Sequence, residues 1–411
     1  MISCRPPDAL RHSLAHGTPT DVAAKTAMTS VSVVVPTYNR AALLDETLRS
    51  ILAQTVLPAE IIVVDDGSTD ETPEVCARQP KLVRYIHQQN SGLPAVARNR
   101  GIEESKAEWV ALCDSDDVWH PKKLEVELAV LRATGMRWAV TGFGLIDPDG
   151  VRIPTTGLGF EREFPVFRQL RRSPREHFSH WLTETRVAMP TGMVDVFVGD
   201  AFGMLFEGNV CLTSSALIAR DLIARSGPFD PAFIRAEDTE FFHRLSAHAP
   251  VSIVMQSLLE YRVGHPSVMS VRDLSPFMRF TLDSLERTAR LRQEMTVAER
   301  RAQRRGRERL RMSLAYERLS SLDRAGARRA LFDGWRSREL FSARAVVLLM
   351  ASFAPLSVLT ALHAAKRGLR AAVRTRLGIR RDAHRNSSRV RNATNEHARD
   401  ARGVTQDGDA G

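Results

Sequence analysis

The sequence contains few cysteines and no pattern that would hold a structural metal ion. Its 411 residues include four cysteines, Cys4, Cys76, Cys113 and Cys211, and no two of them form a Cys-x-x-Cys pair. Such scattered cysteines argue against a disulfide framework and against a zinc site, and they fit a reducing cytosol. We therefore expect a cytoplasmic protein that is stabilised by an ordinary hydrophobic core.

The glycine-rich signatures of the common nucleotide-binding folds are also missing. No Gly-x-Gly-x-x-Gly follows the first expected strand, which argues against a nicotinamide or flavin domain. No Gly-x-x-x-x-Gly-Lys-[Ser/Thr] is present, which argues against a P-loop NTPase. If the protein binds a nucleotide, carboxylates, loop backbone and a metal ion must hold it.

What the sequence does contain is a regular alternation of short apolar runs and amphipathic segments. We expect strands at 31–36, 60–65, 83–87 and 109–113, with helices at 41–54, from about 71, at 94–104 and at 121–135. This alternation predicts an α/β, Rossmann-like fold with a mostly parallel sheet covered by helices on both faces. Further strands are expected at 138–146, 209–218 and 251–255, with a helix over 236–245.

Polar residues gather where the first four expected strands end. They are Thr37 and Asn39, Asp65 and Asp66, Asn90, and Asp114 and Asp116. In parallel sheets, ligands bind beyond the carboxyl ends of the strands. We therefore expect these four strand exits to face one crevice.

The most informative stretch is the apolar run 110–113 followed by Asp114-Ser115-Asp116-Asp117. In an extended chain, Asp114 and Asp116 point the same way, roughly 6.5–7 Å apart, and repel each other by about 2 kcal/mol. A bound cation would relieve this cost, and carboxylate oxygens suit Mg²⁺ or Mn²⁺ shared with substrate phosphates. The simpler alternative is a polar turn in which Asp116 or Asp117 caps a helix.

In these features the chain resembles the family 2 inverting glycosyltransferases of the GT-A fold. Seven short segments carry the resemblance, in order: 33–39, 63–70, 90–92 with 97–102, 114–117, 227–230, 237–238 with 244–245, and 261–262 with 265. The resemblance covers about residues 30–270. It implies a nucleotide-sugar donor, with a UDP-sugar favoured, and a glycan or lipid-linked glycan acceptor.

The same resemblance implies roles for individual residues. Asp238 looks like the general base and Glu237 like its catalytic neighbour, while Asp114 and Asp116 look like the family's metal-binding Asp-x-Asp element, which implies a divalent cation. The implied donor-binding residues are Pro36, Thr37, Tyr38, Asn39, Asp66, Gly92, Arg98, Asp114, Ser115 and His265.

Each of these roles has a simpler structural alternative. Asp66 would be a turn residue, Asp238 an acid that favours a helix start, His265 a structural histidine, and Arg98 a solvated charge on a helix face. For the chain as a whole, two other functions stay open: a catalytically inactive nucleotide- or glycan-binding module, and a sugar nucleotidyltransferase. The loop 37–40 lacks the glycine-rich, basic character expected of a nucleotidyltransferase.

The chemistry expected of such an enzyme is a single displacement. A metal ion stabilises the departing diphosphate, and a carboxylate on the opposite side takes the acceptor's proton, so that attack proceeds with inversion. The Gln-x-x-Arg-Trp element of processive polysaccharide synthases is absent, since His243-Arg244-Leu245 follows the acidic pair. This favours the transfer of one sugar per encounter.

The net charge of +10 belongs largely to the C-terminal part. We expect disordered tails at 1–29, with Met28 as a hypothetical natural start, and at 382–411. Between them we expect a glycosyltransferase domain over 30–275 and a basic helical extension over 276–381. The segment 152–208 within the domain is either a substrate-recognition insertion or a helical cover of the sheet.

The extension contains one stretch, 345–365, without acidic or basic residues, which is just long enough to span a bilayer. Pro355 should break it into two short helices. Three arrangements stay open: an interfacial hairpin on an anionic membrane surface, which we favour, a spanning helix, and packing onto the catalytic domain. No nucleic-acid-binding module is recognisable. We therefore expect a peripheral protein at the cytoplasmic face of the membrane that serves cell-envelope polysaccharide synthesis.

Overall fold

The structure is a computed structural model that describes residues 30–155, 158–264, 273–336, 343–355 and 357. The predicted tails at 1–29 and 382–411 lie outside the described residues, as do His265 and most of the stretch that follows Pro355.

In the described part of the chain, ten strands form one sheet in the order β3–β2–β1–β4–β9–β6–β10–β8–β7, with β5 paired to β10. The strands are β1 Val31–Thr37, β2 Glu60–Asp65, β3 Val83–His87, β4 Trp109–Leu112, β5 Val118–Trp119, β6 Trp138–Ile146, β7 Thr183–Met189, β8 Gly192–Gly199, β9 Ala216–Ala219 and β10 Val251–Arg262. Strands β1 to β4 pair in parallel, and β9 joins β4 to β6 in antiparallel fashion. The predicted α/β fold is confirmed.

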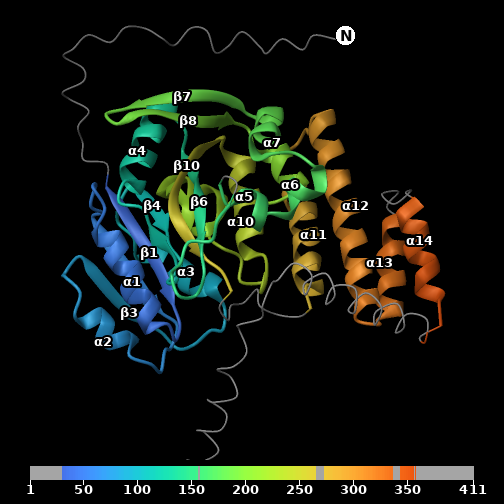
Figure 1. The fold of residues 1–411 in the computed structure, drawn as a ribbon, viewed down its shortest axis with the longest axis horizontal. Helices are drawn as coiled ribbons and strands as arrows, with labels where there is room; N and C mark the ends of the chain where they lie inside the picture. Colours follow the sequence, from blue (N-terminus) through green and yellow to red (C-terminus); the bar gives the residue numbers. More distant parts are fainter. Residues whose placement is uncertain (1–29, 156–157, 265–272, 337–342, 356, 358–411) are drawn as a thin grey trace, which may run out of the picture.

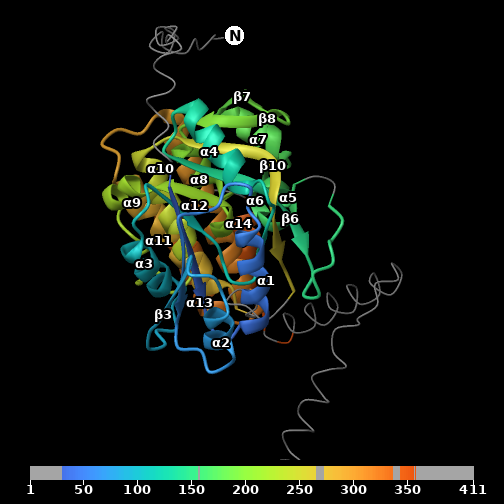
Figure 2. The same cartoon turned by 90° about the vertical axis from the view of Figure 1, so that its left-hand side faces the viewer.

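Helices cover the parallel strands on both faces, and α1 and α3 lie on opposite sides of the sheet (Figure 2). The helices of this part are α1 Ala41–Leu52, α2 Thr72–Ala77, α3 Pro94–Glu104 and α4 Lys123–Thr134. Helix α1 buries Leu44, Leu48 and Ile51, which are spaced so that they share one face. Helix α3 starts at Pro94, which suits the first helical position because it has no N–H to leave unpaired.

Helix α3 lies unusually close to β1. A Cβ atom at Gly101 would stand 2.3 Å from Cγ1 of Val34, so only glycine allows this approach. The close packing fixes the register of α3 against the sheet. It thereby sets the position of Arg98, one turn earlier on the same helix.

The strand predicted at 209–218 is wrong in its first half. Residues Thr213–Ser215 form a short 3₁₀ helix, and β9 covers only Ala216–Ala219. Polar side chains there bond locally instead of leaving the backbone to the sheet: Oγ of Ser215 donates to the carbonyl of Leu212 (2.7 Å), and Oδ1 of Asn209 accepts the N–H of Cys211 (3.0 Å).

The segment predicted as an insertion contains both helices and strands. Its elements are α5 Phe160–Glu163, α6 Pro165–Leu170, α7 Pro174–Trp181, the β7–β8 hairpin and α8 Phe202–Glu207. The hairpin extends the sheet through the pairing of β8 with β10. The aromatic rings of Phe160, Phe167 and Phe178 are buried against one another. The segment therefore covers and extends the sheet, and its role in substrate recognition stays a prediction.

Two helices follow β9 before the C-terminal part, α9 Arg220–Ser226 and α10 Glu237–His248. The C-terminal helices are α11 Ser275–Ala289, α12 Val297–Ser320, α13 Arg324–Arg336 and α14 Ala343–Phe353. They lie at the end of the molecule opposite to β3 and α2 (Figure 1).

Helix α12 packs so closely on α8 that a Cβ atom at Gly306 would stand 1.9 Å from the carbonyl oxygen of Phe206. Phe202, Phe206, Leu285 and Ala302 form the apolar contact between α8, α11 and α12. The beginning of the basic extension thus packs onto the sheet-bearing part.

Helix α14 ends at Phe353, two residues before Pro355, as expected from the missing N–H of proline. No helix in the described part of the chain has the length and apolar character needed to cross a bilayer. The predicted domain limits at 275 and 381 stay predictions.

Candidate active site

The loops after β1 and β2 are tied together at the carboxyl edge of the parallel strands. The N–H of Asn39 donates to Oγ of Ser68 (2.8 Å), and Oδ1 of Asn39 accepts the N–H of Thr69 (2.7 Å). Asn39 has a φ of +50°, which its short amide side chain tolerates better than most. Asp70 accepts the N–H of Ala41, the first residue of α1 (2.9 Å). Asn39 therefore shapes the loop.

The other residues of the predicted nucleotide-binding loop differ in exposure. Pro36 is partly buried near the end of β1, and the Tyr38 side chain is 47% exposed. Thr37 is buried, and its Oγ1 has no hydrogen-bond partner among the described residues. A buried hydroxyl without a partner is uncommon, and here it lies at the end of a strand where a ligand would bind.

Asp66 holds the loop that follows β3. Its carboxylate accepts hydrogen bonds from Nε2 of Gln88 (2.7 Å) and from the N–H and hydroxyl of Ser91 (3.1 and 2.9 Å). Gly92 follows with a φ of +69° and donates its N–H to Oδ1 of Asn90 (2.7 Å). The structure thus shows that Asp66 fixes the loop, and its role in donor binding stays a proposal.

The acidic residues after β4 lie in two different environments. Asp114 keeps 25% of its side chain exposed, and its N–H donates to Oγ of Ser214 (2.9 Å). The Asp116 side chain is 10% exposed, whereas Ser115 and Asp117 are buried. Burial, followed by the charges of Asp116 and Asp114, raises the pKa of Asp117 well above its ordinary value. The loop therefore places one acid, Asp117, inside the protein, while the side chains of Asp114 and Asp116 keep some exposure.

A single buried guanidinium connects this acidic loop to helix α10. Arg98 contacts Oδ1 of Asp114 (2.8 Å) and Oε1 of Glu237 (2.9 Å), and only 7% of its side chain is exposed. Burial opposes the charge of Arg98, but the two carboxylates outweigh it and raise its pKa. Arg98 is thus not a solvated charge on a helix face. It brings together two acids that are 123 positions apart in the sequence numbering.

Asp238 lies next to this cluster at the start of α10. Ala236, the residue directly before α10, has a φ of +61°. This conformation is energetically costly for any residue other than glycine and is often found near functional sites. Burial, and then the charge of Glu237, raises the pKa of Asp238 to about 6. A carboxylate that ionises near pH 6 is well suited to accept a proton at neutral pH.

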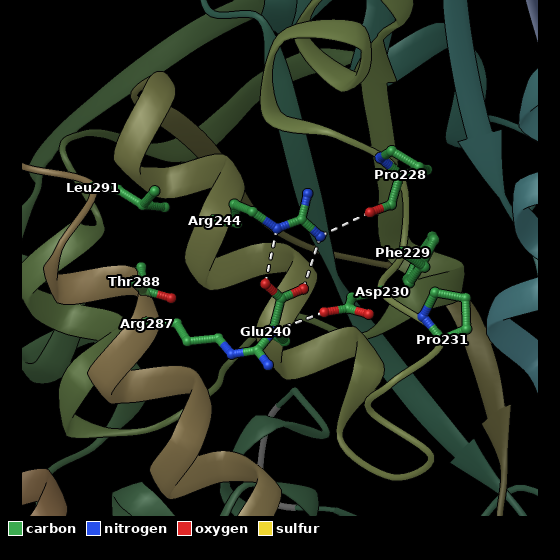
Figure 3. Close-up of a pocket in the computed structure, with 9 residues that line it drawn as sticks. All are labelled: Pro228, Phe229, Asp230, Pro231, Glu240, Arg244, Arg287, Thr288 and Leu291. Carbon is green, nitrogen blue, oxygen red and sulfur yellow. Dashed lines mark hydrogen bonds and ion pairs between the residues drawn. The ribbon is translucent and has the colours of Figure 1, made fainter.

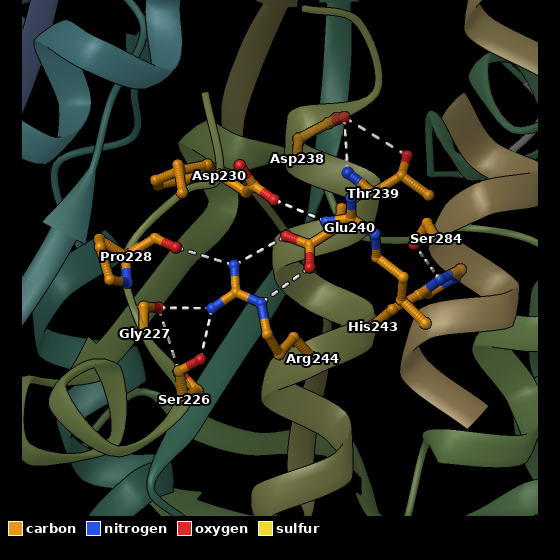
Figure 4. A network of polar contacts seen from close by, with 12 residues as sticks. Ser226, Gly227, Pro228, Asp230, Asp238, Thr239, Glu240, His243, Arg244 and Ser284 are labelled. Carbon is orange, nitrogen blue, oxygen red and sulfur yellow. Dashed lines mark hydrogen bonds and ion pairs between the residues drawn. The ribbon is translucent and has the colours of Figure 1, made fainter. Parts of the chain in front are cut away.

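The turn before α10 is fixed by residues whose role the sequence reasoning did not foresee. The side chain of Asn99 makes two hydrogen bonds to the backbone of Phe229 (2.8 and 2.9 Å). Arg244 binds both carboxylate oxygens of Glu240 (2.8 and 2.7 Å) and donates to the carbonyls of residues 226–228 (Figure 4). Both residues belong to motif segments of the family resemblance, Asn99 to 97–102 and Arg244 to 244–245. The sequence therefore marked them as candidates but did not show what they contact.

Two further arginines bind the acidic loop, and neither was predicted to do so. Arg40, at the start of α1, forms an ion pair with Asp116. Arg262, at the end of β10, is buried; its Nε donates to the carbonyl of Asp116 (3.0 Å), and its guanidinium contacts Glu46 (2.6 Å). Arg40 directly follows the motif segment 33–39, and Arg262 belongs to the segment 261–262. The sequence therefore pointed to this region, but it could not predict which carboxylates the two arginines contact.

A pocket of about 450 Å³ is lined by the turn 228–231 and by residues of α10 and α11 (Figure 3). Its charged side chains pair with each other, as in the contact between Arg287 and Asp230 (2.8 Å). None of the residues predicted to bind donor or metal lines it. His265, the remaining predicted site residue, lies outside the described residues.

The donor atoms present fit a divalent cation that is shared with a substrate. No group of three or more His, Cys, Asp or Glu side chains among the described residues is arranged to hold a metal ion. Asp114 and Asp116 alone offer partly accessible carboxylates in the acidic loop. Mg²⁺ typically binds through one or two carboxylates, with phosphates and water completing its shell. The residues therefore suit a cation whose other ligands come from a diphosphate.

Comparison with known protein families covers the part of this site that comes from β1 to β4 and the acidic loop, but not helix α10 or Arg262. Residues 32–191 match the family model described as "Glycosyl transferase family 2". The chain is 38% identical over 124 residues to the "Putative teichuronic acid biosynthesis glycosyltransferase TuaG" of Bacillus subtilis, covering 29% of this chain and 49% of TuaG. It is 43% identical over 103 residues to the "Poly(ribitol-phosphate) beta-N-acetylglucosaminyltransferase TarP" of Staphylococcus aureus, covering 24% and 32%.

The chain spans less than half the length of each of these relatives. An uncharacterised glycosyltransferase of Rickettsia bellii aligns over 52% of this chain but only 30% of its own length, at 35% identity.

Among solved structures, S. aureus TarS aligns with a TM-score of 0.49 and 17% identity, covering 78% of this chain and 50% of TarS. The mannosyltransferase PcManGT of Pyrobaculum calidifontis, in complex with GDP-Man and Mn²⁺, aligns with a TM-score of 0.48 and 18% identity, covering 85% and 88%.

Proposed function

From a chain whose residues 32–191 match the family 2 glycosyltransferases, we propose a specific reaction. The protein transfers a single sugar from a nucleotide-sugar donor to a glycan or lipid-linked glycan, with inversion at the anomeric carbon. Asp238 acts as the general base and Glu237 as its charged neighbour. A UDP-sugar is the donor that we favour.

The observation that carries this proposal is the position of Arg98. Its guanidinium joins Asp114, at the end of β4, to Glu237, at the start of α10. The predicted leaving-group side and the predicted base side of the reaction therefore meet at one buried cation. An inverting displacement needs a base and a leaving-group site on opposite faces of one sugar, and the shared arginine holds the two groups of residues close enough to serve the same sugar.

Asp238 performs the proton transfer in this mechanism. The acceptor hydroxyl loses its proton to the carboxylate as the hydroxyl oxygen attacks the anomeric carbon. Because the pKa of Asp238 is about 6, the carboxylate is ionised at neutral pH yet basic enough to take up the proton. A positioned base of this kind contributes roughly 10²–10⁴-fold to the rate.

Asp114 and Asp116 would hold Mg²⁺ or Mn²⁺ on the donor diphosphate. When bound, such a cation stabilises the negative charge of the leaving group as a Lewis acid. Around it, this chain's own residues bind and orient the donor. The exposed ring of Tyr38 is available to the nucleotide, and we assign to it also the buried Oγ1 of Thr37, which has no hydrogen-bond partner among the described residues.

We assign seven other residues to donor binding as well. They are Pro36, Asn39, Asp66, Gly92, Arg98, Ser115 and His265.

The acceptor belongs, in our proposal, to cell-envelope polysaccharide synthesis. TuaG is named for teichuronic acid biosynthesis and TarP for the modification of poly(ribitol-phosphate), both of which are polymers. The segment 237–245 lacks the motif of processive synthases, which supports the transfer of one sugar per encounter. The names of these relatives support a polymer as the acceptor, and the missing motif supports a single transfer to it.

We further propose that helix α14 docks on the cytoplasmic face of an anionic membrane, where a lipid-linked acceptor would be found. The helix buries Ala345 and Ser352 and leaves an apolar stripe exposed on its other side: Val346, Val347, Met350 and Phe353 are 49–70% exposed. Exposed Arg344 lies at its start, and Arg328 of α13 stacks on the Phe353 ring at 5.0 Å. An apolar stripe beside arginines matches the two attractions of an anionic bilayer.

Vesicle sedimentation tests this docking. The full chain should pellet with vesicles that contain phosphatidylglycerol and stay in solution with pure phosphatidylcholine. Met350→Glu combined with Phe353→Glu should abolish pelleting, while Leu57→Glu, a change at an exposed apolar position of the other end, should not. Pelleting that the double variant leaves intact would refute docking by α14.

The reaction is tested with a panel of UDP-, GDP- and dTDP-sugars in the presence of Mn²⁺. We expect one nucleotide class to raise the melting temperature and to be hydrolysed slowly without an acceptor. Asp114→Ala should abolish metal-dependent release, while Asp221→Asn, which removes an exposed carboxylate on α9, should leave it unchanged. If no nucleotide stabilises the protein with or without metal, the proposal fails and the inactive binding module is favoured.

A further inference from the structure

Both carboxylates that are expected to hold a cation already have an arginine partner. Asp114 is paired with Arg98, and Asp116 with Arg40. These two arginines differ in how firmly they are held. Arg98 is 7% exposed and bridges two carboxylates, whereas the Arg40 side chain is 26% exposed and, in the described part of the chain, forms an ion pair with Asp116 alone.

The backbone around Arg40 is fixed, so that only its side chain is free to move. On one side, the N–H of Asn39 is bound by Ser68 (2.8 Å); on the other, the N–H of Ala41 is bound by Asp70 (2.9 Å). The carbonyl of Arg40 accepts the N–H of Leu44 (2.9 Å), which begins helix α1. Arg40 can therefore leave Asp116 by rotating its side chain, without any change in the loop that carries the predicted nucleotide contacts.

We propose that Arg40 is an exchangeable counter-ion of the acidic loop. In the absence of donor its guanidinium neutralises Asp116 and competes with a divalent cation for that carboxylate. When the nucleotide diphosphate arrives, Arg40 turns to the phosphate oxygens and Asp116 becomes available to the cation. Cation and nucleotide therefore bind cooperatively, with Arg40 as a positioning residue.

The chemistry of the groups supports an exchange of partners. A guanidinium can bind either a phosphate or a carboxylate, in both cases through two parallel N–H donors. The exchange would keep every charge paired: the arginine moves from the carboxylate to the phosphate, and the carboxylate that it leaves would be neutralised by the cation. Without the diphosphate, a cation would have to displace Arg40 and leave its charge without a partner. The idea rests on the proposed function only for the identity of the incoming diphosphate.

The test is the affinity for Mn²⁺ itself, measured by electron paramagnetic resonance of the free ion on the full chain. Wild-type protein should bind Mn²⁺ at least about tenfold more tightly when UDP or GDP is present. Arg40→Gln should bind Mn²⁺ without nucleotide about tenfold more tightly than wild type, should lose most of the nucleotide effect, and should bind the nucleotide more weakly without metal. By linkage, the metal must raise nucleotide affinity by the same factor as the nucleotide raises metal affinity.

Two variants separate this role from a general loss of charge or of folding. Arg49→Gln removes a positive charge from the same helix, where Arg49 pairs with the exposed Asp45, and should behave as wild type. Arg40→Lys keeps the charge but not the two parallel donors, and should lie between wild type and Arg40→Gln. A disruption of folding would weaken Mn²⁺ binding, whereas the proposal requires it to tighten.

The proposal is overturned if Arg40→Gln and Arg49→Gln bind Mn²⁺ alone within twofold of wild type, or if both tighten equally. It is also overturned if no form of the protein binds Mn²⁺ while donor turnover proceeds without it. If none of the nucleotides binds, the proposed function fails, but the Mn²⁺ affinity of Arg40→Gln without nucleotide still decides whether Arg40 competes for Asp116.

Discussion

Replacing Glu237 by glutamine should move the acidic limb of the pH–rate profile to lower pH. Asp238 must be ionised to act as a base, and burial together with the charge of Glu237 raises its pKa to about 6 from an ordinary value of 3.8. The difference between these two pKa values corresponds to about 3 kcal/mol. The change removes the second-largest cause of the shift and also frees Arg98, whose charge lowers the pKa of Asp238.

We expect the limb to fall by about one unit, from about pH 6 to about pH 5, which corresponds to about 1.4 kcal/mol. At pH 5, wild type should retain about a tenth of its maximal kcat/KM and Glu237→Gln about half, because kcat/KM reports the ionisation of the free enzyme. The maximal rate is expected to fall as well, since Glu237 also positions Arg98. The sign and size of the shift in the limb are the prediction.

The assay is transfer or donor hydrolysis between pH 4.5 and 8.5 with the donor that the nucleotide-sugar panel identifies. Glu240→Gln is the matched control, because it removes a carboxylate from the same helical turn, but one that pairs with Arg244. Its limb should stay within about 0.3 units of wild type. A limb that stays in place or rises in Glu237→Gln would show that Asp238 is not the group that titrates, and would remove the main support for its role as base.

Three further predictions concern catalysis and packing. Asp238→Asn should lower kcat by about 10²–10⁴-fold while nucleotides still raise the melting temperature; a rate within tenfold of wild type would exclude Asp238 as base. Gly306→Ala should destabilise the protein by about 1–3 kcal/mol in a denaturant titration, because its Cβ would stand 1.9 Å from the carbonyl of Phe206; unchanged stability would mean that α12 does not pack on α8 as described. Burial lowers the pKa of His243 to about 4 from 6.5 and outweighs the hydrogen bond from Nε2 to the Leu205 carbonyl (2.8 Å), which acts in the opposite direction. Stability should therefore fall by about 3 kcal/mol as the pH drops from 6.5 to 4; in His243→Asn this acid-dependent loss should shrink, and an equally steep loss would assign it to other groups.

Much of the fold was readable from local sequence signals, because they follow from local physics. The β-branched run of β1, the apolar stripe of α1 and the Pro94 start of α3 each impose one backbone conformation. The strand predicted over 209–218 failed because its hydroxyl side chains compete for backbone hydrogen bonds. The place of β9 between β4 and β6 depends on pairing partners distant in sequence, which periodicity does not encode.

The candidate acids were found for a different reason. Carboxylates crowded at the end of a buried strand are costly unless a cation neutralises them, so Asp114 and Asp116 stood out without any structure. Asp238 was found through the family resemblance, because an acid at a helix start is otherwise favourable and uninformative. The arginines were harder to interpret, since the sequence contains many and a charge on a helix is ordinarily solvated.

The sequence by itself therefore determined the α/β class, the strand ends that carry polar residues and the chemical types available there. Only the tertiary structure decided how the charges pair: Arg98 between Asp114 and Glu237, Arg40 on Asp116, and Arg244 on the turn before α10. The physical reason is that an ion pair depends on the distance between side chains and on burial. The packing of α3 against β1 at Gly101 sets both for Arg98, and no local pattern contains that information.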